Sequence, residues 1–380
     1  MRQETVARLE DAIADAEEKL SQHPERRLDT CHRAVERGEP RPWPVFRLGR
    51  GSDPEAGETM GAKGPPPQLA PEERVLDKVR ALTAPLGMHN PIRPALGRVG
   101  KGTGTLAASF GIPLDPVLDF SPVGYRPLDE VLAEGMPDPE HSGCIPEMRE
   151  TIDAARALTP GWMKIQLPDM QGPFNIVHMV LGDEAFLAPM TEPAKFHALM
   201  TMVTDFFLAL YENLRAWIGE DRLAPFTFDR YRLAECSVNM VSEAFYIDHI
   251  LEHDRRIAEH YGEVGIHPCS GPHVFRVTLK NLPNVVYHEA GYIAQTAAGA
   301  ISVDEALELI GARPVILKIG QELPEGEEEA FIKRDFDRAR ANHRLLFGYT
   351  GMHWRKADEP YIRDLHRRLD DYWHNNVWQG

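Results

Sequence analysis

The sequence predicts one (β/α)8 TIM barrel with an irregular N-terminal extension, on the strength of three observations. Eight short apolar runs recur along the chain, and most are separated by segments with helical periodicity, which together favour a parallel sheet. No Gly-x-Gly-x-x-Gly segment follows the first run and no Walker-type loop is present, which disfavours an open nucleotide-binding sheet. The 380 residues, 43% of them hydrophobic, suffice for one large core.

The strands are predicted from runs of apolar and β-branched residues. They lie at Pro44–Phe46, Val117–Phe120, Trp162–Leu167, Leu233–Val238, Val264–His267, Val285–Tyr287, Val315–Ile319 and Leu345–Gly348.

The helices are predicted from apolar residues spaced three and four apart. The clearest are residues 3–21, Glu192–Trp217, Glu243–His260, Val303–Ile310, Glu327–Asn342 and Pro360–Trp373. Thr191, Ser242 and Ser302 stand where N-terminal caps are expected.

The N-terminal part of the chain is less regular than the rest. Residues 50–71 and 85–124 are rich in Gly and Pro, so both are predicted to be loops, either a lid over a site or simple surface connections. We therefore divide the chain into residues 1–104, an extension that holds the first helix and first strand and packs on the barrel, and residues 105–380, the catalytic barrel.

Composition excludes several classes of partner. The formal charge is −16, which disfavours binding to nucleic acid or to an anionic membrane surface. No apolar run approaches the roughly 18 residues of a membrane span. Four scattered cysteines suggest a reducing compartment. The sequence therefore predicts a cytoplasmic protein that acts on a small molecule or binds a protein partner.

In a barrel of this type, chemistry lies at the carboxyl ends of the strands, and these ends are polar here. They hold Arg47, Asp119, Asp169 with Gln171, Glu235 with Cys236, His267 with Cys269, Glu289, Gln321, and Thr350 with His353. Asp119, Glu235 and Glu289 are the candidate catalytic residues among them.

The sharpest local signal is the segment from Gly265 to Gly271, which contains His267-Pro-Cys269. A histidine and a cysteine two residues apart at a strand end point to the same side, so they could bind one metal ion, and a soft sulfur with an imidazole favours zinc. The alternative is an ordinary packed loop.

Together with this motif, three further segments resemble the uroporphyrinogen decarboxylase superfamily, in particular its zinc-dependent corrinoid methyltransferase branch. Gln171-Gly-Pro-Phe174 resembles the Gly-Pro-Phe segment of that family, and Leu181–Glu184 with Thr191–Pro193 resembles the turn and helix cap that follow it. Val241–Tyr246 resembles its Ser-Pro-Glu-x-Phe/Tyr helix start. The resemblance covers residues 105–375.

The resemblance implies a Zn2+ site, but this chain departs from the family pattern at one ligand. The methyltransferase branch has a second cysteine on the last strand, whereas no cysteine follows Cys269 here. His353 is the expected substitute, giving His267, Cys269 and His353 with a fourth position open; Cys236 and Glu289 are alternative ligands. The arginine-rich segment of the decarboxylase branch is missing, which disfavours a porphyrinogen substrate.

The resemblance also implies the activity: transfer of a methyl group between a small substrate and a separate corrinoid protein, which would supply the cobalamin. No cobalamin-binding Asp-x-His-x-x-Gly segment is present in the chain. Gln171, Phe174, Cys236 and Tyr246 are expected to line the substrate pocket, and Tyr292 and Trp354 are further aromatic candidates. Two other functions stay open, a metal-independent lyase and a barrel that binds a ligand or corrinoid protein without catalysis.

Overall fold

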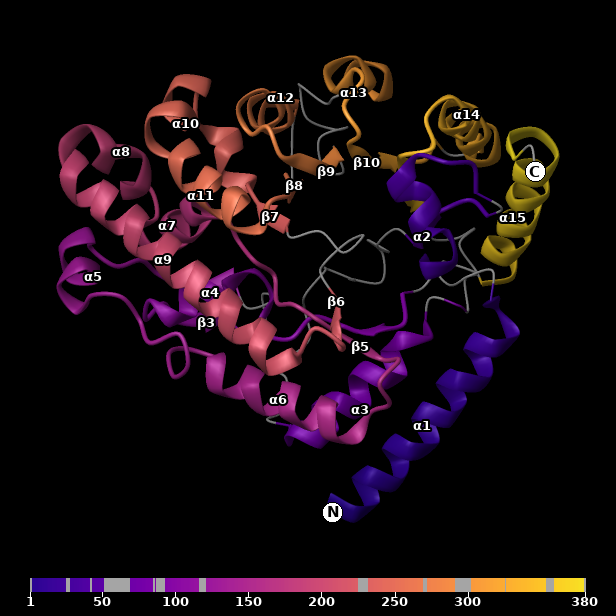
Figure 1. Cartoon of the computed structure of the whole chain (residues 1–380), viewed down its shortest axis with the longest axis horizontal. Helices are drawn as coiled ribbons and strands as arrows, with labels where there is room; N and C mark the ends of the chain where they lie inside the picture. The colour runs from indigo at the N-terminus through magenta and orange to yellow at the C-terminus, as the bar shows by residue number, and fades with distance from the viewer. Residues whose placement is uncertain are drawn as a thin grey trace.

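Parallel β-sheets with helices outside them make up the fold of the chain (Figure 1). The structure, a computed structural model, describes residues 2–24, 28–41, 43–50, 69–84, 86, 93–115, 121–224, 232–268, 272–290, 302–324, 326–352 and 359–378.

The larger sheet has six strands in the order β1-β11-β10-β9-β8-β7, and every neighbouring pair is parallel. These strands are β1 (Phe46–Arg50), β7 (Arg232–Ala234), β8 (Val264–His267), β9 (Val285–Ala290), β10 (Ile316–Glu322) and β11 (Leu345–Met352). Because all are parallel, their carboxyl ends lie at the same edge of the sheet.

The smaller parallel sheet has the order β2-β5-β6, and its strands are β2 (Ala95–Leu96), β5 (Lys164–Gln166) and β6 (Leu223–Ala224). A parallel bridge between Gln171 and Ala234 joins the segment after β5 to β7. No pairing of β1 with β2 occurs within the described residues, so the closed barrel predicted from the sequence is not shown. The shown architecture is mixed α/β with parallel sheets.

Fifteen α-helices are present in the described ranges. They are α1 (Arg2–Gln22), α2 (Leu28–Arg37), α3 (Pro71–Leu82), α4 (Thr105–Ser109), α5 (Leu128–Glu134), α6 (Ile145–Leu158), α7 (Pro173–Leu181), α8 (Glu184–Thr191), α9 (Pro193–Ile218), α10 (Glu243–His249), α11 (Leu251–Tyr261), α12 (Pro272–Asn281), α13 (Val303–Ile310), α14 (Glu328–Ala341) and α15 (Glu359–Tyr372). In Figure 1, α12, α13 and α14 lie outside β8, β9 and β10, and α3 and α6 lie outside β5.

Most strand predictions are confirmed, and β8 has the predicted bounds. Two are corrected. The strand predicted at Leu233–Val238 ends at Ala234, because the chain turns there into the 3-10 helix η4 (Cys236–Met240). The two-residue strand β2 was not predicted, because two residues carry no periodic signal. The predicted strand Val117–Phe120 lies outside the described residues, between β3 (Leu114–Asp115) and β4 (Ser121–Pro122), an antiparallel pair.

The helix predictions are confirmed with one break. The predicted helix Glu243–His260 is two helices, α10 and α11, which meet at Ile250. Ser242 caps α10 by accepting a hydrogen bond from the Phe245 amide, and Ser302 caps α13 in the same way. Thr191 is not a cap, because it is the last residue of α8 and its hydroxyl donates to the Leu187 carbonyl.

A buried arginine ties the N-terminal region to the C-terminal part of the chain. Arg41 donates to the carbonyl oxygens of His343 and Leu345, and its guanidinium lies 5.0 Å from the ring centre of Trp373. Trp373 belongs to the π-helix η5 (Trp373–Val377), and its indole donates back to the Arg41 carbonyl. Burial lowers the pKa of Arg41 to about 10.

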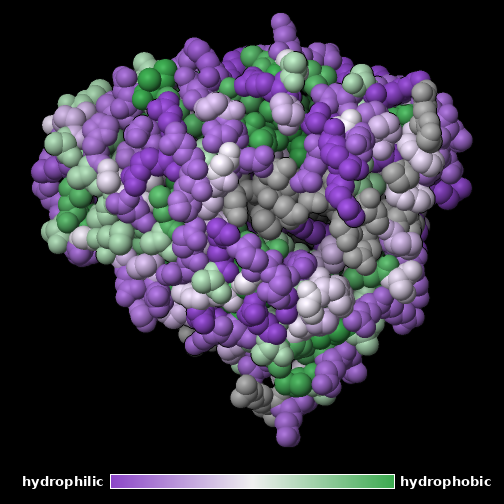
Figure 2. All heavy atoms as spheres, in the orientation of Figure 1, coloured by the Kyte–Doolittle hydropathy of each residue, from purple (hydrophilic) through white to green (hydrophobic). Residues whose placement is uncertain are grey.

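The surface in view is mostly hydrophilic (Figure 2). Apolar residues show at several places in this view, among them the region of α5 and α8, where α8 carries the exposed Leu187 and Met190. Within the described part of the chain, none of the helices has the length and apolar character to cross a membrane.

Candidate functional site

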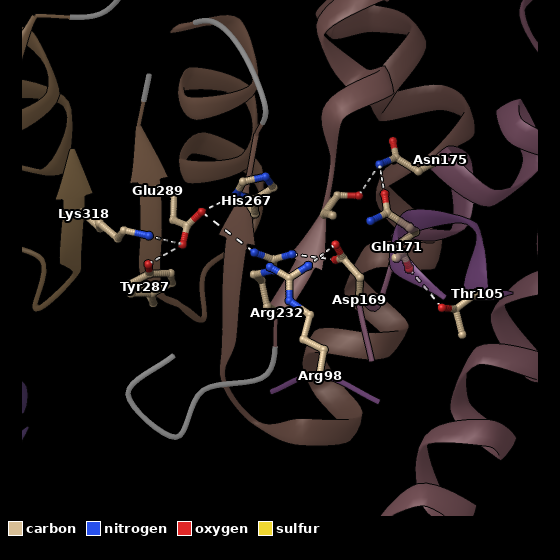
Figure 3. A network of polar contacts seen from close by, with 12 residues as sticks. Arg98, Thr105, Asp169, Gln171, Asn175, Arg232, His267, Tyr287, Glu289 and Lys318 are labelled. Carbon is tan, nitrogen blue, oxygen red and sulfur yellow. Dashed lines mark hydrogen bonds and ion pairs between the residues drawn. The ribbon is translucent and has the colours of Figure 1, made fainter. Parts of the chain in front are cut away.

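Four neighbouring parallel strands contribute charged or titratable side chains to a single polar network (Figure 3). Arg232 comes from β7, His267 from β8, Glu289 from β9 and Lys318 from β10. These side chains lie together because each stands on a strand hydrogen-bonded to the next in register.

Glu289 is the centre of the network. Its Oε1 accepts a hydrogen bond of 2.6 Å from the Tyr287 hydroxyl and one of 3.2 Å from Lys318 Nζ. Its Oε2 accepts from His267 Nδ1 and lies 3.9 Å from Arg232 Nη1. Burial favours the neutral carboxyl, but the charges of Lys318, His267 and Arg232 outweigh it and hold the pKa of Glu289 well below its usual range. The group is therefore a carboxylate at neutral pH.

Alternation along β9 explains why Tyr287 and Glu289 share a face while His288 points to the other. His288 is fully buried against α12, where its ring lies 4.4 Å from that of Phe275 and its Nε2 lies 3.0 Å from the Thr278 hydroxyl. Its Nδ1 donates to the Glu289 carbonyl at 2.6 Å, because a carbonyl only accepts. Burial lowers the pKa of His288 to about 3, so it stays neutral and holds the end of β9.

A second carboxylate, Asp169, lies on the other side of Arg232. Its two oxygens accept hydrogen bonds from Arg232 (2.6 Å) and Arg98 (2.5 Å). Burial opposes the charge of Asp169, but the two guanidinium groups prevail and lower its pKa. Arg232 is thereby fixed between Asp169 and Glu289.

The pairing of His267 with Glu289 defines what the imidazole can do. Because a carboxylate only accepts, Nδ1 of His267 carries the proton that is donated to Glu289, so whenever the ring is neutral its lone pair is on Nε2. A histidine fixed in this way by a carboxylate is typical of a metal ligand or of a general base.

Glu235 is next to His267 in the sheet, but its side chain points elsewhere. Its amide donates to the His267 carbonyl at 2.9 Å, whereas its carboxyl group is fully buried and finds no hydrogen-bond partner within the described residues. Burial, reinforced by the negative charge of Asp254 on α11, raises the pKa of Glu235 well above its usual range. Burial also raises the pKa of Asp254 to about 7, although the Tyr246 hydroxyl donates to it at 2.9 Å.

The predicted pocket residues lie in the packing layer beside β7. Phe174 is fully buried on α7 among the rings of Phe186, Phe196 and Phe245. Tyr246 is fully buried on α10. Gln171 is buried and accepts a hydrogen bond from Asn175 at 2.9 Å, and Cys236 is half-buried at the start of η4.

Several predicted site residues lie outside the described residues, namely Asp119, Cys269, Tyr292, His353 and Trp354. Among the residues that are described, no group of three or more His, Cys, Asp and Glu side chains could hold a metal ion. The ligand set of His267, Cys269 and His353 thus stays a prediction.

Three cations of the network were missed in the sequence: Arg98, Arg232 and Lys318. Lys318 carried a signal, because a charge between Leu317 and Ile319 inside a predicted strand needs a partner when buried. Arg98 carried none, because it follows a two-residue strand in an irregular stretch.

No protein-family model matches the chain, and no curated protein matches its sequence. The fold is similar to that of a solved structure, a methyltransferase from Methanosarcina mazei, with a TM-score of 0.59 and 16% sequence identity. The alignment covers 90% of this chain and 97% of that one. At this identity the likeness shows a shared, methyltransferase-like fold.

Proposed function

We propose that this protein is a zinc-dependent methyltransferase that moves a methyl group between a small substrate and a separate corrinoid protein. The observation that carries the proposal is His267. Its ring is oriented by the ionised Glu289 at the carboxyl end of β8, two residues before Cys269, in a chain whose fold is similar to that of a methyltransferase.

A closed (β/α)8 barrel is part of the proposal. Following the pairings from β1 through β11, β10, β9, β8 and β7 and across the Gln171–Ala234 bridge to β5 and β2 gives eight strand positions, if β6 and β7 count as two parts of one. A pairing of β1 with β2 would close the ring.

His267 is suited to bind a zinc ion. His267 Nε2 keeps its lone pair because Nδ1 faces Glu289, which is the usual arrangement of a metal-bound histidine and its carboxylate partner. We propose His267, Cys269 and His353 as the ligands. When bound there, zinc would supply Lewis acidity toward a substrate oxygen or sulfur.

The other residues of the network hold this arrangement. Glu289 keeps the proton on Nδ1 of His267, and Lys318 and Arg232 keep Glu289 ionised. Asp169, itself held by Arg98, fixes Arg232.

The charge of the proposed ligand set bears on the substrate. One thiolate with two imidazoles leaves the site net positive, which suits polarising an oxygen better than releasing a softened thiolate. We therefore favour a methoxylated compound as methyl donor. The cobalamin would come from the corrinoid protein.

A metal-independent lyase is the second candidate function, and the pairing of His267 with Glu289 favours it. A neutral imidazole whose Nδ1–H is held by a carboxylate is also the arrangement of a general base.

Metal analysis and activity separate the two candidates. The purified protein should hold about one zinc ion per chain, and Cys269→Ser should lose both zinc and methyl transfer while keeping its fold. His353→Ala should bind zinc on the order of tenfold more weakly. Full activity of a metal-free sample, or methyl transfer without any corrinoid, would exclude the proposed mechanism.

A further inference from the structure

A pair of histidines meets between α9 and α10. His197 lies on α9 and His249 is the last residue of α10. Nε2 of His197 and Nδ1 of His249 are 3.4 Å apart, and the two rings are tilted by 39° with centres 5.4 Å apart. Both side chains are half-buried, so solvent reaches them.

This separation matches a metal chelate. Two imidazole nitrogens bound to one tetrahedral zinc ion at about 2.0 to 2.1 Å stand about 3.3 Å apart. We propose that His197 and His249 form a second transition-metal site, for Zn2+ or Cu2+, with water completing the coordination. The proposal does not depend on the proposed methyl transfer.

The state of the His249 ring favours a metal over a proton. Burial, with the neighbouring His197, lowers the pKa of His249, so the ring is neutral and its nitrogens can bind a metal at neutral pH. The negative charge of the adjacent Asp248 acts on His249 and favours a cation there.

The rings are held by aromatic neighbours. His249 packs edge-on against Phe245 at 4.9 Å and Phe196 at 6.1 Å, and His197 against Phe196 at 5.8 Å. This packing lowers the cost of ordering two side chains when a metal binds.

The site has two protein ligands within the described residues. His253 on α11 lies close enough to His197 for the two rings to interact electrostatically. Its Nδ1, however, lies 3.0 Å from the Thr204 hydroxyl, with which it shares a hydrogen bond. Because no third side-chain ligand joins the pair in the described ranges, this site should bind zinc more weakly than a three-ligand site. A bound metal would fasten α10, which carries Tyr246, to α9.

Zinc titration of the chelator-stripped full chain tests the proposal. Competition with a chromophoric chelator should show that the wild type binds one zinc equivalent more than either His197→Ala or His249→Ala. His260→Ala, which changes a half-exposed histidine of α11 paired with Glu212, is the matched control and should bind as the wild type does. Zinc should also raise the thermal unfolding midpoint of the wild type and the control more than that of the two variants.

Equal zinc binding by the wild type and both variants would overturn the proposal. His197→Gln and His249→Gln give the same comparison if an alanine variant folds poorly. Cys269→Ser reports on the strand-end site separately, so each proposal can fail while the other stands.

Discussion

Glu289 and Glu235 are two buried carboxyl groups near the ends of strands that flank β8, and the structure treats them in opposite ways. Glu289 is surrounded by Lys318, Arg232 and His267 and is ionised. Glu235 has no hydrogen-bond partner in the described part of the chain and faces the acidic Asp254, so it is neutral. A carboxyl group is thus charged or neutral here according to the face of the sheet it occupies, since depth of burial is similar.

The polar network around Glu289 is suited to chemistry, whereas Glu235 and Asp254 form a pair of buried acids in the packing between β7 and the helices. Arg232 and Glu235 are three residues apart on the same chain segment, and alternation sends them to opposite faces. Glu235 faces Asp254 of α11, whereas Arg232 faces Asp169 and Glu289. Glu235 therefore belongs to the side covered by helices.

The largest expected effect is the pH dependence of stability caused by the acid pair. Asp254 has its pKa raised from near 4 to about 7, so the folded chain binds more protons than the unfolded chain between these values and loses stability as pH rises. Asp254→Asn should remove this loss. Its free energy of unfolding should rise relative to that of the wild type by on the order of 4 kcal/mol between pH 4 and pH 8. Chemical unfolding at several pH values measures it, and parallel curves for the two proteins would contradict the neutral state of the pair.

The next effect tests how tightly Glu235 is enclosed. A Cβ atom on Gly172 would overlap with Oε1 of Glu235, so Gly172→Ala should lower the free energy of unfolding by about 3 kcal/mol. The double variant Gly172→Ala/Glu235→Ala should recover part of this loss, because it removes the overlapping oxygen. Gly161→Ala, where no atom lies within 4 Å of the added Cβ, is the control. Additive losses in the double variant would show that the two residues do not meet.

Activity should distinguish the two carboxyl groups directly. Glu289→Gln removes the charge that fixes His267 and should reduce zinc affinity or methyl transfer on the order of ten- to a hundredfold. Glu235→Gln should leave activity near the wild-type level, because its side chain lies on the other face. Steady-state kinetics with a corrinoid acceptor, together with zinc content, makes the comparison, and the reverse ranking would reject it.

The smallest effect concerns the outer end of the network. Arg98 has 41% of its side chain exposed, and Asp169 keeps Arg232 when Arg98 is lost. Arg98→Ala should therefore lower the free energy of unfolding by about 1 kcal/mol or less. Arg232→Ala, which leaves both buried carboxylates without this partner, should cost clearly more in the same unfolding assay. Equal losses would mean that the two arginines contribute alike.

The sequence by itself determined the local elements that carry a strong periodic signal. β8 and α13 have the predicted bounds, because apolar runs and the Ser302 cap are properties of neighbouring residues. The proximity of His267 and Glu289 could also be predicted, because parallel strands bring their carboxyl ends together at the same edge of the sheet.

Only the tertiary structure decided which face each strand-end side chain occupies. Parallel strands are covered on both sides, so apolar residues stand on both faces and alternation cannot tell one from the other. For this reason the sequence ranked Glu235 and Glu289 alike, and only the packing of α10 and α11 separates them. The partners of Asp169 and the meeting of His197 with His249 depend on contacts between distant segments, which no local pattern encodes.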